Sequence, residues 1–360
     1  MSAWQATEAT RRLGIQQPII QGPFGGGLST VKLAAIVSNM GGLGSYGAHN
    51  LAPAEIGKIA DEIRAQTSQP FALNLWVSDH DTGGKTLDAE AFERAWRLFA
   101  PYFAELGIDK PELPSHFHHA FDEQIEALIE ARPPVFSFVF GIPSPAILRA
   151  CRARGIATVG AATSITEAMA LEDAGIDLIV ATGFEAGGHR PAFLARAEDS
   201  LMGTFALTQL VSRRVTRPVI AAGGIADANG LRAALTLGAQ AGQIGTAFLA
   251  CAESNATEEH RAVLFSDRAQ QTVLTRAFSG RLARGVRNRW SEEWAARAAD
   301  VAPFPVQNWF LSKLRPAAVK AGRTDLVSLW SGQIAPNLEH RSAASLMAAL
   351  VGEAEAAGAA

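Results

Sequence analysis

A strand pattern that ends in a glycine-rich turn and a histidine is the part of this sequence best suited to chemistry. Residues 176–191 read IDLIVATGFEAGGHRP, and the apolar run 178–181 predicts a strand that is buried on both faces. Gly187 and Gly188 allow backbone conformations, or a close approach of a ligand, that a side chain would forbid. His189 follows with a ring whose ordinary pKa of about 6.5 suits an acid, a base or an anchor for an anion. The alternative is an ordinary turn with an exposed histidine.

Two further glycine-containing turns predict a phosphate site. Gly223 and Gly224 follow one apolar run, and Gly245 and Thr246 lie in the next. Free backbone amides, the start of a following helix and the Thr246 hydroxyl together suit an anion. Enzymes built on eight-stranded barrels commonly bind phosphate at the loops after strands seven and eight. Either turn alone is readily explained as purely structural, but the two together predict a phosphorylated ligand.

Polar and glycine residues near the first and third strand patterns extend this candidate site. The segment QGPFGGG places glycines from Gly22 to Gly27, where main chain can lie against a flat ligand. Asn74 interrupts the apolar segment FALNLWV, and a buried carboxamide must either pair with backbone or present its donor and acceptor to a polar ring. Glu185 is interpreted as a partner of His189 or as an ordinary turn charge.

A metal site is not expected. His116, His118 and His119 are neighbours in sequence, but no carboxylate or cysteine pattern accompanies them, so we expect them in a lid or on the surface. Only two cysteines, Cys151 and Cys251, are present, which excludes a disulfide framework and a zinc site made of four thiolates.

Eight short apolar runs alternate with amphipathic segments and predict the scaffold. The runs are 18–22, 42–46, 71–77, 135–141, 157–160, 178–181, 219–222 and 242–249. This order predicts an α/β fold, a (β/α)8 TIM barrel, with a doubly wound open sheet as the competing arrangement. Helix-start signals support the alternation: Ser144 before a proline, Ser164 with Glu167 at capping-box spacing, and Asp227 at the head of a helix that Gly238 closes.

Two regions exceed a minimal barrel. We assign residues 1–252 to the barrel, including an insert, 78–134, after the third strand. Residues 253–360 are expected to form a helical extension that packs on the barrel. Either region is a candidate lid over the ligand, because long insertions in barrel loops usually bind a ligand or cover its site.

Composition excludes several classes of protein. A net charge of -3 and 19% charged residues provide no basic field for nucleic acid. We find no apolar run of about 18 residues that could cross a membrane and no signal peptide, so we expect a cytoplasmic protein. The sequence leaves the oligomeric state open, a homodimer included. It has no GxSxG elbow, no P-loop lysine motif and no GxGxxG after the first strand.

In order along the chain, these segments resemble the FMN-dependent nitronate monooxygenase family, formerly called 2-nitropropane dioxygenases. The similar segments are PIIQGPFGG, FALNLWV, GFEAGGHR, VIAAGGIADANG and AGQIGTAFLACAES, followed by TRAFSGRLARGVRN and LWSGQ, which resemble class I members. The resemblance spans most of the chain. Single segments are less specific, since enoyl reductases of the same flavin-barrel superfamily share several.

The resemblance implies a cofactor, a site and a reaction. FMN would be its cofactor, and His189 matches the family's catalytic histidine. The cofactor-binding residues that it implies are Gly22, Pro23, Phe24, Asn74, Thr182, Gly187, Gly188, Gly223, Gly224, Gln243, Gly245 and Thr246. An alkyl nitronate such as propionate 3-nitronate would lie between His189 and the flavin. With molecular oxygen it would give a carbonyl compound and nitrite or a related nitrogen oxyanion.

Two positions depart from the family pattern. Thr182 stands where many members have glutamine, and Phe24 stands where methionine is common. These differences bear on the identity of the substrate more than on the identity of the cofactor. The alternatives are an FMN-dependent enoyl thioester reductase or NAD(P)H:acceptor reductase, and a barrel that binds a phosphorylated ligand without redox chemistry.

Overall fold

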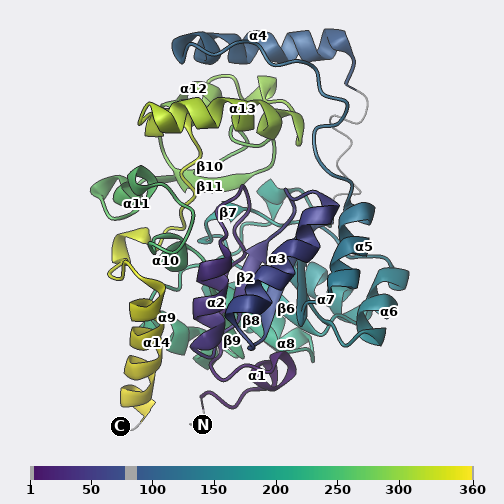
Figure 1. Ribbon diagram of the computed structural model, residues 1–360. Helices are drawn as coiled ribbons and strands as arrows, with labels where there is room; N and C mark the ends of the chain where they lie inside the picture. The colour runs from purple at the N-terminus through teal and green to yellow at the C-terminus, as the bar shows by residue number, and fades with distance from the viewer. Residues whose placement is uncertain (1–3, 78–86, 359–360) are drawn as a thin grey trace.

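Eight parallel strands form a closed barrel at the centre of the molecule. The computed structural model describes residues 4–77 and 87–358 (Figure 1). The strands are β1 (Ile19–Gln21), β2 (Gly44–Gly47), β3 (Phe71–Trp76), β4 (Val135–Val139), β5 (Ala157–Ala162), β6 (Leu178–Thr182), β8 (Val219–Ala222) and β9 (Ala241–Ile244). Their order is β1-β9-β8-β6-β5-β4-β3-β2, and a parallel bridge between Ile20 and Leu43 joins the two ends. The predicted (β/α)8 barrel is therefore confirmed, and the open doubly wound sheet is excluded.

The last predicted strand is too long. β9 ends at Ile244, and the next residues form a short helix, α10 (Thr246–Leu249). Every residue of α10 is buried, so its apolar run looks the same in the sequence as that of a buried strand. The error matters for the site, because it places Gly245 at the beginning of a helix and not inside a strand.

Helices surround the barrel. They are α1 (Glu8–Leu13), α2 (Val31–Asn39), α3 (Pro53–Gln66), α5 (Phe121–Ala131), α6 (Pro145–Ala153), α7 (Ile165–Asp173), α8 (Thr204–Arg214) and α9 (Ala228–Thr236). The predicted caps are present, because the side chains of Ser144, Ser164 and Asp227 each accept the amide three residues on. The reciprocal half of the Ser164 capping box is wrong: Glu167 instead accepts hydrogen bonds from Thr163 and Phe193.

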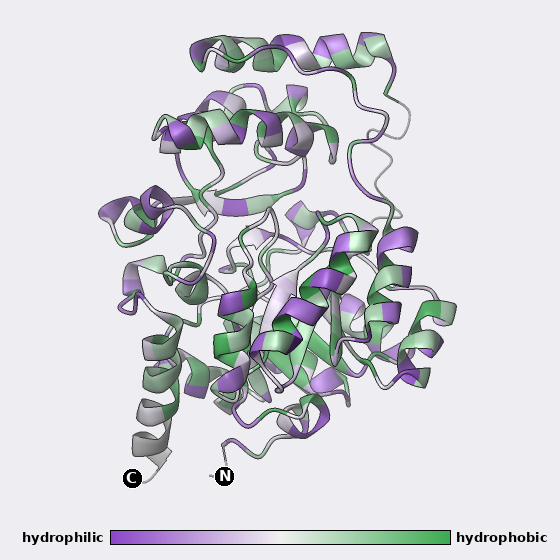
Figure 2. Ribbon diagram, viewed as in Figure 1, coloured by the Kyte–Doolittle hydropathy of each residue, from purple (hydrophilic) through white to green (hydrophobic). Residues whose placement is uncertain are grey.

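Apolar side chains on both faces of the strands explain why the barrel is stable. Inside it, residues such as Val135, Val180 and Ile220 pack together. Outside it, Leu73, Phe136 and other strand residues pack against the surrounding helices. Figure 2 shows the hydrophobic colour concentrated on these strands, with hydrophilic residues on the outer helix faces. This two-sided burial is what the near-continuous apolar runs predicted.

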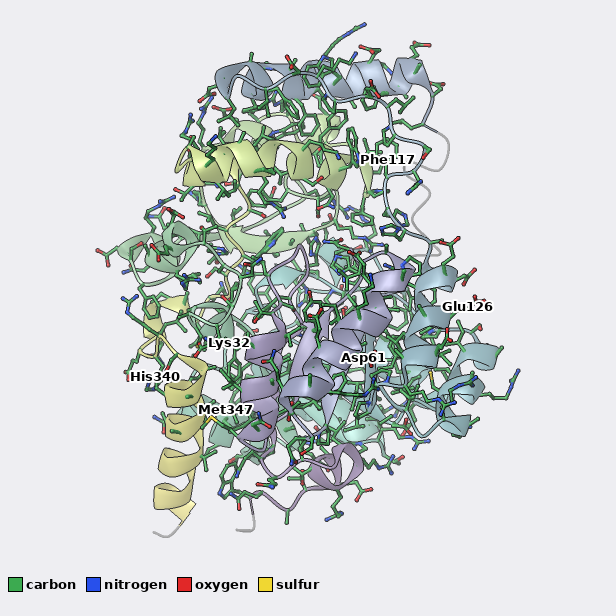
Figure 3. All side chains as sticks on the ribbon, in the orientation of Figure 1. Lys32, Asp61, Phe117, Glu126, His340 and Met347 are labelled. Carbon is green, nitrogen blue, oxygen red and sulfur yellow. The ribbon has the colours of Figure 1, made fainter. Side chains whose placement is uncertain are left out.

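The two helices of the segment after the third strand pack in different parts of the molecule. Its helix α4 (Ala89–Glu105) lies far from the barrel, above α12 (Arg289–Ala295) and α13 (Val306–Lys320) (Figure 1). Stacked rings join them, with the Phe99 and Phe310 centroids 4.5 Å apart. Phe117, labelled in Figure 3, also reaches this cluster and lies edge-on to Trp309. Helix α5 instead packs on α3 against the barrel.

The predicted helical extension also contains strands, so the prediction was wrong in part. Besides α11 (Glu258–Leu264) and α14 (Ala343–Gly358), it holds β10 (Thr272–Thr275) and β11 (Ala283–Val286). These two pair antiparallel with β7 (Gly188–His189), which belongs to the loop after β6. Strand β11 therefore holds the histidine loop from above.

The remaining elements complete the fold. The 3-10 helices are Ala197–Asp199, Asp267–Gln270, Ala298–Asp300, Thr324–Leu326 and Ala335–Asn337. Helix α14 returns to the barrel beside α2 and α9, and Met347 (Figure 3) belongs to the buried cluster between them. Within the described ranges, no helix combines the length and the apolar character needed to cross a lipid bilayer.

Candidate active site

A cavity lies between the carboxyl ends of the barrel strands and the extension. Its volume is about 210 Å³. The structure brings every predicted site residue to its wall: Gly22, Pro23, Phe24, Asn74, Thr182, Gly187, Gly188, His189, Gly223, Gly224, Gln243, Gly245 and Thr246. These residues come from loops far apart in the sequence, and the barrel gathers them because all its strands end on the same side.

The turns after β8 and β9 form an open cradle of backbone. Gly223 and Gly224 have φ angles of +108° and +72°, which side chains rarely adopt. Gly245 differs, because its φ is -98° and a Cβ there would meet no atom within 4 Å. The Thr246 hydroxyl accepts the Gly332 amide at 2.9 Å, which leaves its own proton for another acceptor. The cradle therefore offers donors, as an anion requires.

Two of the other predicted glycines lie where one backbone packs against another, which the sequence did not indicate. A Cβ on Gly22 would lie 3.3 Å from the Gly245 Cα, so the first and last loops of the barrel meet there. A Cβ on Gly187 would lie 2.5 Å from the Gly332 amide nitrogen. Close packing of one backbone on another is thus enough to require glycine at Gly187, whereas at Gly22 a side chain would need a shift of a few tenths of an ångström.

The polar side chains of the wall keep hydrogen-bonding groups for a ligand. The Asn74 amide nitrogen donates to the Ser137 hydroxyl at 3.0 Å, and its side-chain oxygen has no described protein partner. Neither Thr182 nor Gln243 makes a side-chain hydrogen bond to any described residue, and both line the cavity. Phe24 is held in place by Ser29, whose hydroxyl donates to its carbonyl and accepts from its amide.

His189 lies at the cavity wall, in the short strand β7. Its Nε2 atom is 2.8 Å from the Ser279 hydroxyl, and its ring lies edge-on to Trp76 with centroids 4.9 Å apart. Trp330 lies on another side, with a centroid distance of 5.1 Å. The Nδ1 atom has no hydrogen-bond partner among the described residues. One ring nitrogen is therefore oriented by the protein, and the other remains for a ligand.

The surroundings keep His189 neutral. Desolvation, followed by the positive charge of Arg281 and the influence of His49, lowers the pKa of His189 to about 3. Arg281 lies 3.8 Å above the Phe140 ring, and it comes from the segment between β10 and β11, as Ser279 does. At neutral pH the imidazole is thus uncharged and sits in a positive field.

The proposed partnership of Glu185 with His189 is not found. The Glu185 carboxylate instead accepts from the backbone and the hydroxyl of Thr204, both at 2.8 Å, at the first residue of α8. Ser279, 90 residues away in the sequence, takes the place that we considered for Glu185. As for metals, no group of three or more histidine, cysteine or acidic residues suits an ion within 4–77 and 87–358.

Several residues that line the cavity were missed in the sequence. His49 follows β2 and stacks on Trp76, with centroids 3.9 Å apart and planes 8° apart. Desolvation and Arg281 lower its pKa to about 3 as well. Arg315 enters from α13. A histidine just after a predicted strand was a usable signal for His49. For Arg315 there was none, because nothing in a helix sequence tells which barrel loop it will cover.

Comparison with known proteins identifies the chain as a whole. The model of the nitronate monooxygenase family matches residues 7–353. A probable nitronate monooxygenase of Staphylococcus aureus (strain Newman) is 39% identical over 331 residues, 92% of each chain. The structure of nitroalkane oxidase from Streptomyces ansochromogenes has a TM-score of 0.86 and 32% identity, covering 97% of this chain and 98% of the other. FabK from Thermotoga maritima has a TM-score of 0.73 and 28% identity, covering 98% and 96%.

These matches agree with the barrel and with the cavity. A family match over nearly the whole chain includes the extension as well as the barrel, so it covers every loop that reaches the cavity. This protein belongs to the nitronate monooxygenase family and is a flavin-dependent oxidoreductase.

Proposed function

We propose that the protein uses FMN and molecular oxygen to oxidise alkyl nitronates, such as propionate 3-nitronate, to a carbonyl compound and nitrite or a related nitrogen oxyanion. The observation that carries the proposal is the neutral His189 ring at the cavity wall, with one ring nitrogen held by Ser279 and the other free of any described partner. An uncharged ring that can donate a hydrogen bond into the cavity suits a small anion, and a nitronate is one.

The residues of the cavity fit FMN. The cradle at Gly224, Gly245 and Thr246 has open space and free donors where a phosphate would lie. The side-chain oxygen of Asn74 and the Gln243 amide would serve the polar edge of the ring system. When bound, the flavin supplies the electron-accepting chemistry, and the protein positions the substrate beside it.

His189 is better suited to a nitronate than to a neutral nitroalkane. A base with a pKa of about 3 removes a proton from carbon poorly, because efficient proton transfer needs a pKa near the working pH. A nitronate has already lost that proton. In this role His189 orients the anion by a hydrogen bond from Nδ1, in the tautomer in which Nε2 accepts the proton of the Ser279 hydroxyl.

The test mixes purified holoenzyme with preformed nitronate, with the matching neutral nitroalkane, and with NADH or NADPH. Without oxygen, we expect the nitronate to bleach the flavin absorbance; in air, it should consume oxygen and release nitrite. The neutral nitroalkane should react much more slowly when it is added fresh. Bleaching by NAD(P)H with no response to nitronate would reject the proposal and favour the alternative, a flavin-dependent reductase.

A further inference from the structure

Arg315 is a charged residue of the cavity that the reaction described above does not use. It lies on α13, and it is the one lysine or arginine that lines the cavity in the described part of the chain. Its terminal nitrogen donates to the Gly26 carbonyl at 3.3 Å. The guanidinium is thereby placed over the loop that follows β1.

Nothing described neutralises this guanidinium. No carboxylate in residues 4–77 or 87–358 forms an ion pair with Arg315, and its Nε atom is buried without a hydrogen-bond partner. Burial lowers the pKa of Arg315, and the titratable neighbour is His260, whose own pKa is lowered in part by the Arg315 charge. A partly buried guanidinium with one hydrogen bond to a carbonyl keeps donors for an anion, and an anion would offset the cost of removing this charge from water.

Other polar groups share this end of the cavity. Asn308 also lines the cavity, seven residues before Arg315 and therefore on the same side of α13. From the barrel, His49 packs directly on Gly25, where a Cβ would lie 2.4 Å from its ring. We call Arg315, Asn308 and His49 the α13 recess. It combines one positive charge with an amide and an imidazole that can donate hydrogen bonds.

The α13 recess is distinct from the phosphate cradle. The cradle is made by the turns after β8 and β9 together with Gly332, whereas Arg315 contacts the loop after β1. A carboxylate matches the planar fork of a guanidinium and accepts from amides and imidazoles.

We propose that Arg315 is a specificity-determining residue that binds a carboxylate on the substrate at a distance from the reacting carbon. This inference rests on the proposed nitronate oxidation and adds to it a preference between nitronates. The α13 recess would select substrates whose far end carries a negative charge over those whose far end is a methyl group.

The experiment compares propionate 3-nitronate with butyl 1-nitronate, which replaces the carboxylate by an alkyl end. The measured quantity is the ratio of their kcat/KM values. We expect a ratio above about 10 for the wild-type holoenzyme, a ratio near one for Arg315→Met, and a preserved preference for Arg315→Lys. Lys320→Met removes an exposed positive charge from the same helix and is the matched control, with a wild-type ratio.

A second measurement does not depend on turnover. Calorimetric titration of the holoenzyme with 3-nitropropionate should give a Kd at least about 10-fold weaker for Arg315→Met than for wild type, with no such difference for 1-nitropropane. Equal binding of 3-nitropropionate to both proteins would overturn the inference. The inference would also be overturned if Arg315→Met lost FMN but kept its affinity for 3-nitropropionate, because Arg315 would then serve the cofactor. If wild type oxidises neither nitronate, the proposed function fails, and the titration still decides the role of Arg315.

Discussion

Replacing Gly245 by alanine should weaken FMN binding while leaving the fold intact. The backbone φ of -98° is accessible to alanine, and no described atom beyond the adjacent residues lies within 4 Å of the new Cβ. The chain itself therefore gives no reason for glycine at this position. If the cofactor phosphate occupies the cradle, the new methyl group displaces it from a backbone amide. A hydrogen bond to a charged group contributes about 1.5–3 kcal/mol, so the Kd for FMN should rise by about 10- to 150-fold.

Riboflavin makes this prediction specific, because it lacks the phosphate. Apoprotein would be titrated with FMN and with riboflavin, following the quenching of flavin fluorescence, for wild type and Gly245→Ala. Only the FMN affinity should fall, and thermal unfolding of the apoprotein should shift little. Gly224→Val is the strained counterpart, because its φ of +72° should make the substitution weaken the apoprotein as well as FMN binding. Equal losses for FMN and riboflavin on Gly245→Ala would show that the phosphate lies elsewhere.

Three further predictions concern the histidines and the aromatic cluster. His189→Ala should retain FMN yet reduce nitronate turnover by about 100-fold or more, and near-normal turnover would contradict the assigned role. Buried His260 has a pKa lowered to about 4, so the protein loses stability as the pH falls from 6.5 toward 4, because the unfolded chain then binds a proton that the folded chain does not. This loss is about 2 kcal/mol between pH 7 and 5, and His260→Gln should remove it from denaturant-unfolding curves; an unchanged slope would refute that. Phe99→Ala should destabilise the layer of α4 and α13 by about 3–5 kcal/mol, seen as early proteolysis of α4; unchanged protection would contradict the packing.

The barrel was predictable because its signals are local. Two-sided burial produces apolar runs, and caps such as Ser144 mark helix starts. Once a barrel is inferred, all its strand ends share one side, and His189 and Gly224 fall at the same cavity without any knowledge of contacts. The same reasoning failed at Gly245, where a buried helix and a buried strand have the same apolar composition.

Contacts between distant segments were not predictable. Ser279 and Arg281 set the environment of His189, but they lie in a segment that was expected to be helical. The pairing of β11 with β7 depends on the chain returning across the mouth of the barrel, and no periodicity in either segment records that return. Likewise, Arg315 reads as an ordinary charge in a helix until α13 is placed over the first loop.

The extension therefore has a chemical as well as a covering role. Strand β11 pairs with His189 through Ala283, and the Arg190 amide donates to the Leu282 carbonyl, so two consecutive residues of the loop are fixed to the extension. The segment leading into β11 supplies the hydroxyl that orients the His189 ring and the positive charge that, after desolvation, further lowers its pKa. The barrel alone would present the same histidine on a glycine-rich loop, without the Ser279 hydrogen bond and without the Arg281 contribution to its lowered pKa. The chemistry assigned to the barrel thus depends on residues that come almost 100 positions later in the chain.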